Sequence, residues 1–201
     1  MDRSYLYKMS FQFIFIFIWV SSILYAQNKV ITLTWSELSQ QKKSDILNDS
    51  KLYENAKNLY ENEFHLSDDS LTFDLLDTLS NPPQKFLPLY FELFLQIVDK
   101  SDGALSEVMG LYCMRQSLNQ TQYIFKELNR LTDLGKEHEI LKKYADFIGY
   151  EIWFEDDPNE SFEKYKDNVV QKTNILDNEN KKMVDIFLKY VKDFIKKIDA
   201  N

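Results

Sequence analysis

Four acidic residues beside two aromatic residues, within the stretch GYEIWFEDDPNE, are the best candidates for chemistry in this chain. The four are Glu151, Glu155, Asp156 and Asp157. Glu151 and Glu155 are four residues apart, which places both carboxylates on one face of a helix, next to Trp153 and Phe154. Two carboxylates beside aromatic rings can hold a sugar and act as general acid and base in its hydrolysis. The residues also fit a simpler interpretation, in which the aromatic side chains end a buried helix and the acids are solvated or cap the next helix.

A second acidic grouping, VDKSDGALSEV, has the composition of a calcium-binding loop but lacks its spacing. A standard calcium loop needs oxygen ligands at positions 1, 3 and 5, a glycine at position 6 and a glutamate at position 12. Counted from Asp99, Gly103 is fifth and Glu107 is ninth. The acidic residues here are better explained by a helix cap at Ser101 or Asp102.

Metal, nucleophile and phosphate chemistry have no further support in the sequence. Neither His65 nor His138 has a glutamate three residues before it, as a di-iron site in a helical bundle would require. No Gly-x-Ser-x-Gly elbow and no glycine-rich phosphate loop occurs. The sequence therefore predicts no metal site and no cofactor, and it offers no catalytic candidates outside the four acids above.

The single cysteine, Cys113, lies in the stretch SEVMGLYCMRQS. Small residues recur there at Ser106, Gly110, Cys113 and Ser117. In a helix this spacing places them in one stripe, which predicts that a neighbouring backbone approaches closely. Large apolar side chains predict burial of most of the remaining circumference; they are Leu105, Val108, Met109, Leu111 and Tyr112. Cys113 is expected to be a packed core residue, because no adjacent base or cation would stabilise its thiolate.

The elements that position these residues are expected to be helices joined by short loops. Apolar residues recur at intervals of three and four residues, and the chain has only four glycines and four prolines. Thr34 and Glu37 have the spacing of a capping box and predict a helix that starts at Trp35. Asp157 followed by Pro158 predicts another start near residue 158. Nine helices are expected, near residues 35–47, 51–65, 70–79, 84–98, 103–117, 121–132, 135–154, 158–173 and 178–198.

Two of these segments have contrasting apolar patterns. Residues 84–98 are apolar almost all round, which predicts a helix at the centre of the fold. Residues 178–198 carry a single apolar stripe, which predicts an outer helix with one covered face. The stripe consists of Met183, Phe187, Tyr190, Val191, Phe194 and Ile198.

The first 26 residues have the pattern of a secretory signal peptide. Arg3 and Lys8 precede an apolar run from Phe11 to Val20, and Ala26 is the expected cleavage site. The alternative is that residues 9–28 remain as a membrane anchor. In both cases residues 27–201, expected to form a single helical domain, are exported to the periplasm or secreted.

The charge balance limits the possible partners. The chain has 24 basic and 32 acidic residues, a net charge of −8. An acidic surface repels phosphate backbones, so nucleic acid is not an expected partner. Contact with a membrane is expected only through the N-terminal apolar segment, if it is not cleaved. A single cysteine excludes an internal disulfide, so the core must hold the domain together.

Together these patterns predict an all-α fold, either an irregular helical bundle or a short stack of α-hairpins, after an N-terminal signal peptide. The leading functional hypothesis is an exported, acidic, non-catalytic module that binds another protein in the cell envelope or periplasm. The alternative hypothesis is a carboxylate-dependent hydrolase that acts on a glycan or peptide through Glu151, Glu155, Asp156 or Asp157.

Overall fold

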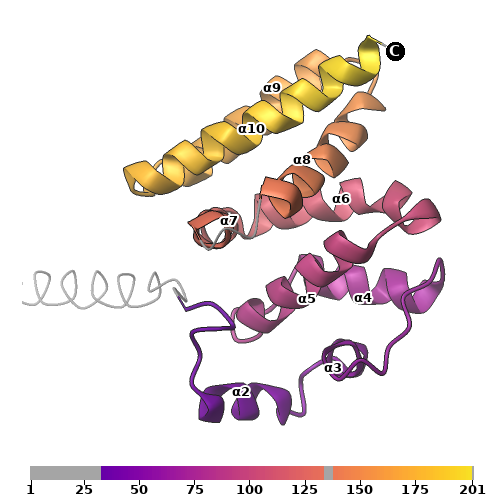
Figure 1. The fold of residues 1–201 in the computed structure, drawn as a ribbon, viewed down its shortest axis with the longest axis vertical. Coiled ribbons are helices and arrows are strands. Elements are labelled where there is room, and N and C mark those ends of the chain that lie inside the picture. The colour runs from indigo at the N-terminus through magenta and orange to yellow at the C-terminus, as the bar shows by residue number, and fades with distance from the viewer. Residues whose placement is uncertain (1–32, 134–137, 201) are drawn as a thin grey trace, which may run out of the picture. The chain divides into compact units, whose positions relative to one another are not determined.

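The structure is a computed structural model that describes residues 33–133 and 138–200. Within these ranges the regular structure consists of nine α-helices and no strand, which confirms the predicted all-α class there (Figure 1). The helices are α2 (Gln40–Leu47), α3 (Glu54–Tyr60), α4 (Ser70–Ser80), α5 (Leu87–Lys100), α6 (Gly103–Asn119), α7 (Thr121–Asp133), α8 (His138–Trp153), α9 (Pro158–Thr173) and α10 (Asn178–Asp199). The predicted signal peptide, residues 1–26, and the alternative anchor, residues 9–28, lie outside the described residues. None of the helices in the described ranges has the length and apolarity needed to cross a bilayer.

The first helix begins later than its capping signal predicts. The capping box itself forms, because the Glu37 amide donates to Thr34 Oγ1 at 3.2 Å and the Thr34 amide donates to Glu37 Oε2 at 2.9 Å. It closes an isolated turn, however, in which Trp35 is buried. Helix α2 then starts at Gln40, directly after a second N-cap, in which the Ser39 side chain accepts a hydrogen bond from the amide of Lys42. The prediction of a helix start at Trp35 was therefore wrong by five residues, because a second cap and the burial of Trp35 decide the boundary.

Helix α3 ends at Tyr60, five residues before the predicted end. Asn62 has a φ of 62°, in the left-handed region that stops a helix and that asparagine tolerates better than most residues. The amides of Glu63 and Phe64 both donate to the carbonyl of Asn58, which completes the helix end. The residues that follow leave the helix and form the wall of a cavity described below.

Helix α5 is buried on nearly all sides, as the sequence predicted. It packs against α3, α4 and α8. Pro88 lies in its first turn, where a missing amide costs little. Each large apolar side chain that it buries contributes about 1.5–3 kcal/mol relative to exposure. Its buried residues are Leu87, Pro88, Leu89, Tyr90, Phe91, Leu93, Phe94, Leu95, Ile97 and Val98.

Helix α8 packs against both earlier and later helices of the described fold. It packs against α5 and α6 on one side and against α9 and α10 on the other (Figure 1). Tyr144 of α8 is fully buried, and its hydroxyl lies 3.0 Å from the carbonyl oxygen of Cys113 and 3.1 Å from Oε1 of Gln116, two acceptors on α6. The amide group of Gln116 in turn donates to the carbonyl of Leu79 at the end of α4. A buried polar chain thus fixes α8 to α6 and α6 to α4.

Helix α10 is amphipathic, as predicted. Met183, Phe187 and Val191 of the predicted stripe are buried, together with other apolar residues of the same face, whereas Tyr190, Phe194 and Ile198 are half-buried. The opposite face is exposed and, apart from Ile186, polar. Helix α10 lies along α8 and α9, and its C-terminal end comes close to the end of α8 (Figure 1).

Candidate functional site

The position of α8 is set by the stripe of small residues on α6. A Cβ atom at position 110 would lie 2.6 Å from the carbonyl oxygen of Phe147 and 2.8 Å from Cβ of Glu151, closer than Cβ atoms approach in proteins. Only glycine allows this contact, so the predicted close approach of a neighbouring backbone is confirmed. Ser117, at the other end of the stripe, forms a buried hydrogen bond of 2.7 Å with the hydroxyl of Tyr165 on α9.

Cys113 is fully buried within this contact. Burial raises the pKa of its thiol well above the usual value, because the thiolate would lose its hydration. Arg115 turns away from it and pairs with Asp77 of α4. The expectation that Cys113 packs in the core is confirmed. The broader expectation for α6 was wrong at Leu111, which is 44% exposed, because it lies opposite the face that packs against the other helices.

The end of α8 and the start of α9 form a tight corner around the four predicted acids. Helix α8 ends at Trp153, and the amide of Glu155 still donates to the carbonyl of Ile152. Asp157 then caps α9, accepting from the amides of Asn159 and Glu160 at 3.0 Å each, with Pro158 as the first helical residue. The predicted helix start at residue 158 is therefore confirmed.

Three aromatic rings form a cluster at this corner, which we call the α8 aromatic cluster: Tyr150, Trp153 and Phe154. The rings of Tyr150 and Phe154 meet edge to face with centroids 4.8 Å apart, and those of Trp153 and Phe154 do so at 5.1 Å. Trp153 is held in place by a hydrogen bond of 2.9 Å from its Nε1 to Oδ1 of Asp199 at the end of α10. Phe154 follows the end of α8 and is 64% exposed. The simpler interpretation is confirmed for three of the acids, since Asp157 caps α9 and Glu155 and Asp156 are exposed.

The four predicted acids differ in their environments. Glu151 is half-buried beside Gly110, and burial, reinforced by the charge of Glu155, raises the pKa of its carboxyl group. Asp157 is used by the cap of α9, and Glu155 and Asp156 are exposed. The structure thus brings Glu151 and Glu155 together and turns Asp157 towards a helix backbone. Chemically, the corner presents apolar rings next to carboxylates.

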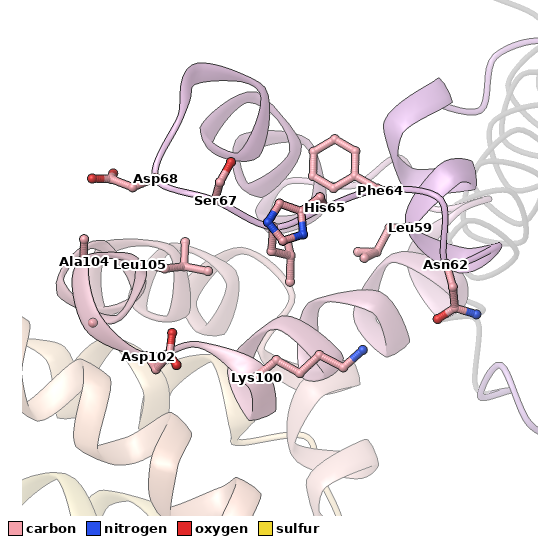
Figure 2. A pocket seen from close by; sticks show the side chains of 12 residues that line it. Leu59, Asn62, Phe64, His65, Ser67, Asp68, Lys100, Asp102, Ala104 and Leu105 are labelled. Atoms are coloured by element: carbon pink, nitrogen blue, oxygen red, sulfur yellow. The ribbon is translucent and has the colours of Figure 1, made fainter.

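A separate cavity of about 490 Å³ lies between the connection from α3 to α4 and the start of α6 (Figure 2). Its apolar lining includes Leu59 and Leu105, and its rim carries His65, Lys100 and Asp102, whose side chains are all exposed. Asp102 occupies the N-cap position of α6 but makes no capping hydrogen bond through its side chain. The volume is large enough for a small molecule, but the polar groups of the rim are of mixed charge and are not held in place by one another.

A cluster of titratable groups around α7 was missed by the sequence analysis. Glu127 has a side chain that is only 7% exposed and pairs with Arg130 at 3.2 Å. Burial raises the pKa of the Glu127 carboxyl to about 6, and the charges of Glu37 and Glu92 add to the shift. The hydroxyl of Tyr123, next to the same groups, is buried with no hydrogen-bond partner in the described structure. The three glutamates are far apart in the sequence, so no local sequence pattern predicts that they lie close together.

Within the described ranges, no three or more histidine, cysteine, aspartate or glutamate side chains lie close enough together to hold a metal ion. Asp99, Asp102 and Glu107, the acids of the calcium-like stretch, are exposed. Comparison of the chain with models of known protein families, with curated protein sequences and with solved structures gives no match.

Proposed function

We propose that this chain is an exported, non-catalytic module that binds another protein through the α8 aromatic cluster. The observation that carries the proposal is the 64% exposure of Phe154 in contact with two further aromatic rings. Aromatic side chains dominate the binding energy of protein interfaces, and clustered rings on a surface are a feature of interaction sites. Export is supported by the signal-peptide pattern of residues 1–26.

The cluster is well suited to binding in energetic terms. Burying a phenylalanine side chain is worth about 1.5–3 kcal/mol, and most of the Phe154 side chain is still available for burial. The hydrogen bond from Trp153 to Asp199 holds the neighbouring ring before a partner arrives. Little side-chain entropy is then lost on binding, which increases the affinity that a given contact area can give.

The scaffold behind the cluster supports a rigid binding surface. We propose an irregular helical bundle rather than a stack of consecutive hairpins, because α8 packs against α5 and α6 as well as α9 and α10. The close contact at Gly110 and the hydrogen bonds of Tyr144 attach α8 to α6 along its length. A binding surface at the end of such a helix keeps its shape.

The hydrolase hypothesis has one supporting observation, the raised pKa of Glu151 beside Glu155. A general acid requires such a pKa, but it also requires a second carboxylate that faces a common substrate. Glu155 is close to Glu151 but exposed, Asp157 bonds to the amides of α9, and none of the four acids lines a described cavity. Binding is therefore the function that the geometry of this corner favours.

Site-specific photo-crosslinking tests the proposal. A photoreactive phenylalanine analogue is placed at position 154 of the full-length chain in the cells that produce it, and the crosslinked products are identified by mass spectrometry. Position 175 is the matched control, because Ile175 is an apolar residue that is 71% exposed on another part of the surface. We expect one recurring polypeptide crosslinked from position 154 and not from position 175. Failure to crosslink from position 154, or identical products from both positions, would contradict the proposal.

A further inference from the structure

The α8 aromatic cluster lies in the longest acidic stretch of the protein. Between Tyr144 and Glu163 the sequence has no lysine, arginine or histidine. The same stretch has seven acidic residues: Asp146, Glu151, Glu155, Asp156, Asp157, Glu160 and Glu163. The basic residues nearest in sequence are Lys143 and Lys164. This segment therefore brings only negative charge to the corner; the positive charges of Lys196 and Lys197 lie on another element, in the last turn of α10 with Asp199.

The acids at the edges of the stretch are neutralised, whereas those next to the cluster are not. Asp146 pairs with Lys142, and Glu163 pairs with Lys166 and Lys192. The ion pairs of the described part of the chain do not include Glu151, Glu155 or Asp156. Glu155 and Asp156 are exposed and directly follow Phe154 in the chain. Two exposed carboxylates outside these ion pairs thus directly follow the exposed ring in the chain.

We infer that the α8 aromatic cluster binds a segment of a partner polypeptide in which an apolar side chain is flanked by lysine or arginine. The inference rests on the proposed function and names the chemistry of its partner. The apolar side chain would pack on Phe154 and Trp153, while the cationic groups reach Glu155 and Asp156. Arginine and lysine also bind favourably over aromatic faces, which adds to the match. Complementary charge gives such a contact its specificity and speeds association.

A second copy of the chain fits this surface poorly. A symmetric dimer places the same patch of each copy face to face, so Glu155 and Asp156 of one copy would meet the acids of the other. Like charges brought together at an interface cost several kcal/mol. An acidic partner or an anionic membrane surface would meet the same repulsion, so charge complementarity favours a basic polypeptide.

Binding of synthetic peptides to the full-length chain tests the inference. The first peptide has a central tryptophan flanked on both sides by lysines; in the second, glutamates replace the lysines; in the third, glycine replaces the tryptophan. Affinity is measured by fluorescence anisotropy at low and high salt. We expect the lysine–tryptophan peptide to bind at least about tenfold more tightly than either of the others, with affinity that falls as salt rises.

Variants of the chain separate the contribution of the ring from that of the charges. Phe154→Ser and the double variant Glu155→Lys with Asp156→Lys should each weaken binding of the first peptide by about tenfold or more. Ile175→Ser is the apolar control. Asp185→Lys is the charge control, because Asp185 is exposed and is fourteen residues from Asp199, about 21 Å along α10. Circular dichroism checks that each variant is folded, and both controls should leave the affinity unchanged.

Equal affinity for the lysine and glutamate peptides, loss of affinity in the control variants, or no binding of the first peptide would overturn the inference. So would self-association in sedimentation experiments that Phe154→Ser abolishes, since a second copy would then occupy the surface. These results differ from failure of the proposed function. If crosslinking from position 154 captures a polypeptide whose contacting segment is neutral or acidic, the binding function stands and only the cationic chemistry is wrong.

Discussion

Replacement of Gly110 by alanine tests the helix contact that positions the α8–α9 corner. The added methyl group would lie 2.6 Å from the carbonyl oxygen of Phe147, 2.8 Å from Cβ of Glu151 and 3.0 Å from its Oε2. The nearest of these atoms belongs to the backbone of α8, so it cannot move aside unless the helix moves. We expect α6 and α8 to separate slightly and the packing of α8 on the rest of the fold to weaken.

Two opposing effects set the magnitude. Alanine is about 1 kcal/mol more favourable than glycine within a helix, and this difference stabilises the variant. Overpacking of a close contact costs about 1–3 kcal/mol, and a rigid backbone neighbour places Gly110→Ala in the upper part of that range. The expected net loss is about 1–2 kcal/mol of unfolding free energy. For a domain of this size, that lowers the Tm by about 2–8 °C.

The assay is urea denaturation followed by circular dichroism, with Gly149→Ala as the matched control. At position 149 an added methyl group would lie 2.8 Å from Cδ1 of Phe194, on a half-buried ring that can shift, and 3.1 Å from the carbonyl oxygen of Val191, farther than the 2.6 Å to the backbone at position 110. The gain in helix propensity is the same, so Gly149→Ala should cost less stability than Gly110→Ala. If Gly110→Ala is more stable than the natural chain, or no less stable than Gly149→Ala, the account of the α6–α8 contact is refuted.

Three further predictions concern the core. The contribution of Glu127 to stability should fall by about 1 kcal/mol as pH rises from 4.5 to 6, because its carboxyl group binds its proton more tightly in the folded chain than in the unfolded one; in Glu127→Gln, urea titrations across this pH window should lack that component, and an unchanged pH profile would contradict it. Ser117→Ala should lower the unfolding free energy by about 1–3 kcal/mol, because it leaves the Tyr165 hydroxyl buried without its partner. Denaturation of the double variant with Tyr165→Phe should show that part of this loss is recovered, whereas additive losses of the two single variants would contradict the hydrogen bond. Cys113 should react with a thiol reagent only as fast as the protein opens, so rapid labelling of the folded chain would contradict its burial.

Local signals predicted much of the fold because the interacting groups are close in sequence. The cap at Asp157 and its two amide donors span only four residues, so the start of α9 could be read directly. The stripe on α6 predicted a close helix contact because glycine at position 110 is unfavourable in a helix unless a neighbour requires it. The apolar circumference of α5 likewise predicted its burial.

The boundaries that were wrong depended on competition between local signals and distant contacts. Thr34 and Ser39 are both competent caps, and the choice between them depends on burial of Trp35 against residues outside its own turn, including Tyr60. The end of α3 depends on one residue, Asn62, in the left-handed conformation. Asparagine adopts that conformation only in some contexts, so the sequence alone did not indicate it.

The candidate site was only partly accessible from the sequence. The sequence pointed to this stretch because acids and aromatic residues are adjacent there. It did not predict that Phe154 is exposed, because this depends on how α8 packs against its neighbours. The glutamates around Tyr123 were not predicted, because the fold brings them together from residues 37, 92 and 127.

The dissociation constant of the polypeptide captured from position 154 tests the central claim most directly. It is measured for the natural full-length chain, for Phe154→Ser and for Ile175→Ser, two variants that each remove one exposed apolar side chain. If the α8 aromatic cluster is the binding surface, Phe154→Ser weakens binding by about tenfold or more and Ile175→Ser leaves it unchanged. Equal affinity for the natural chain and Phe154→Ser would contradict the claim.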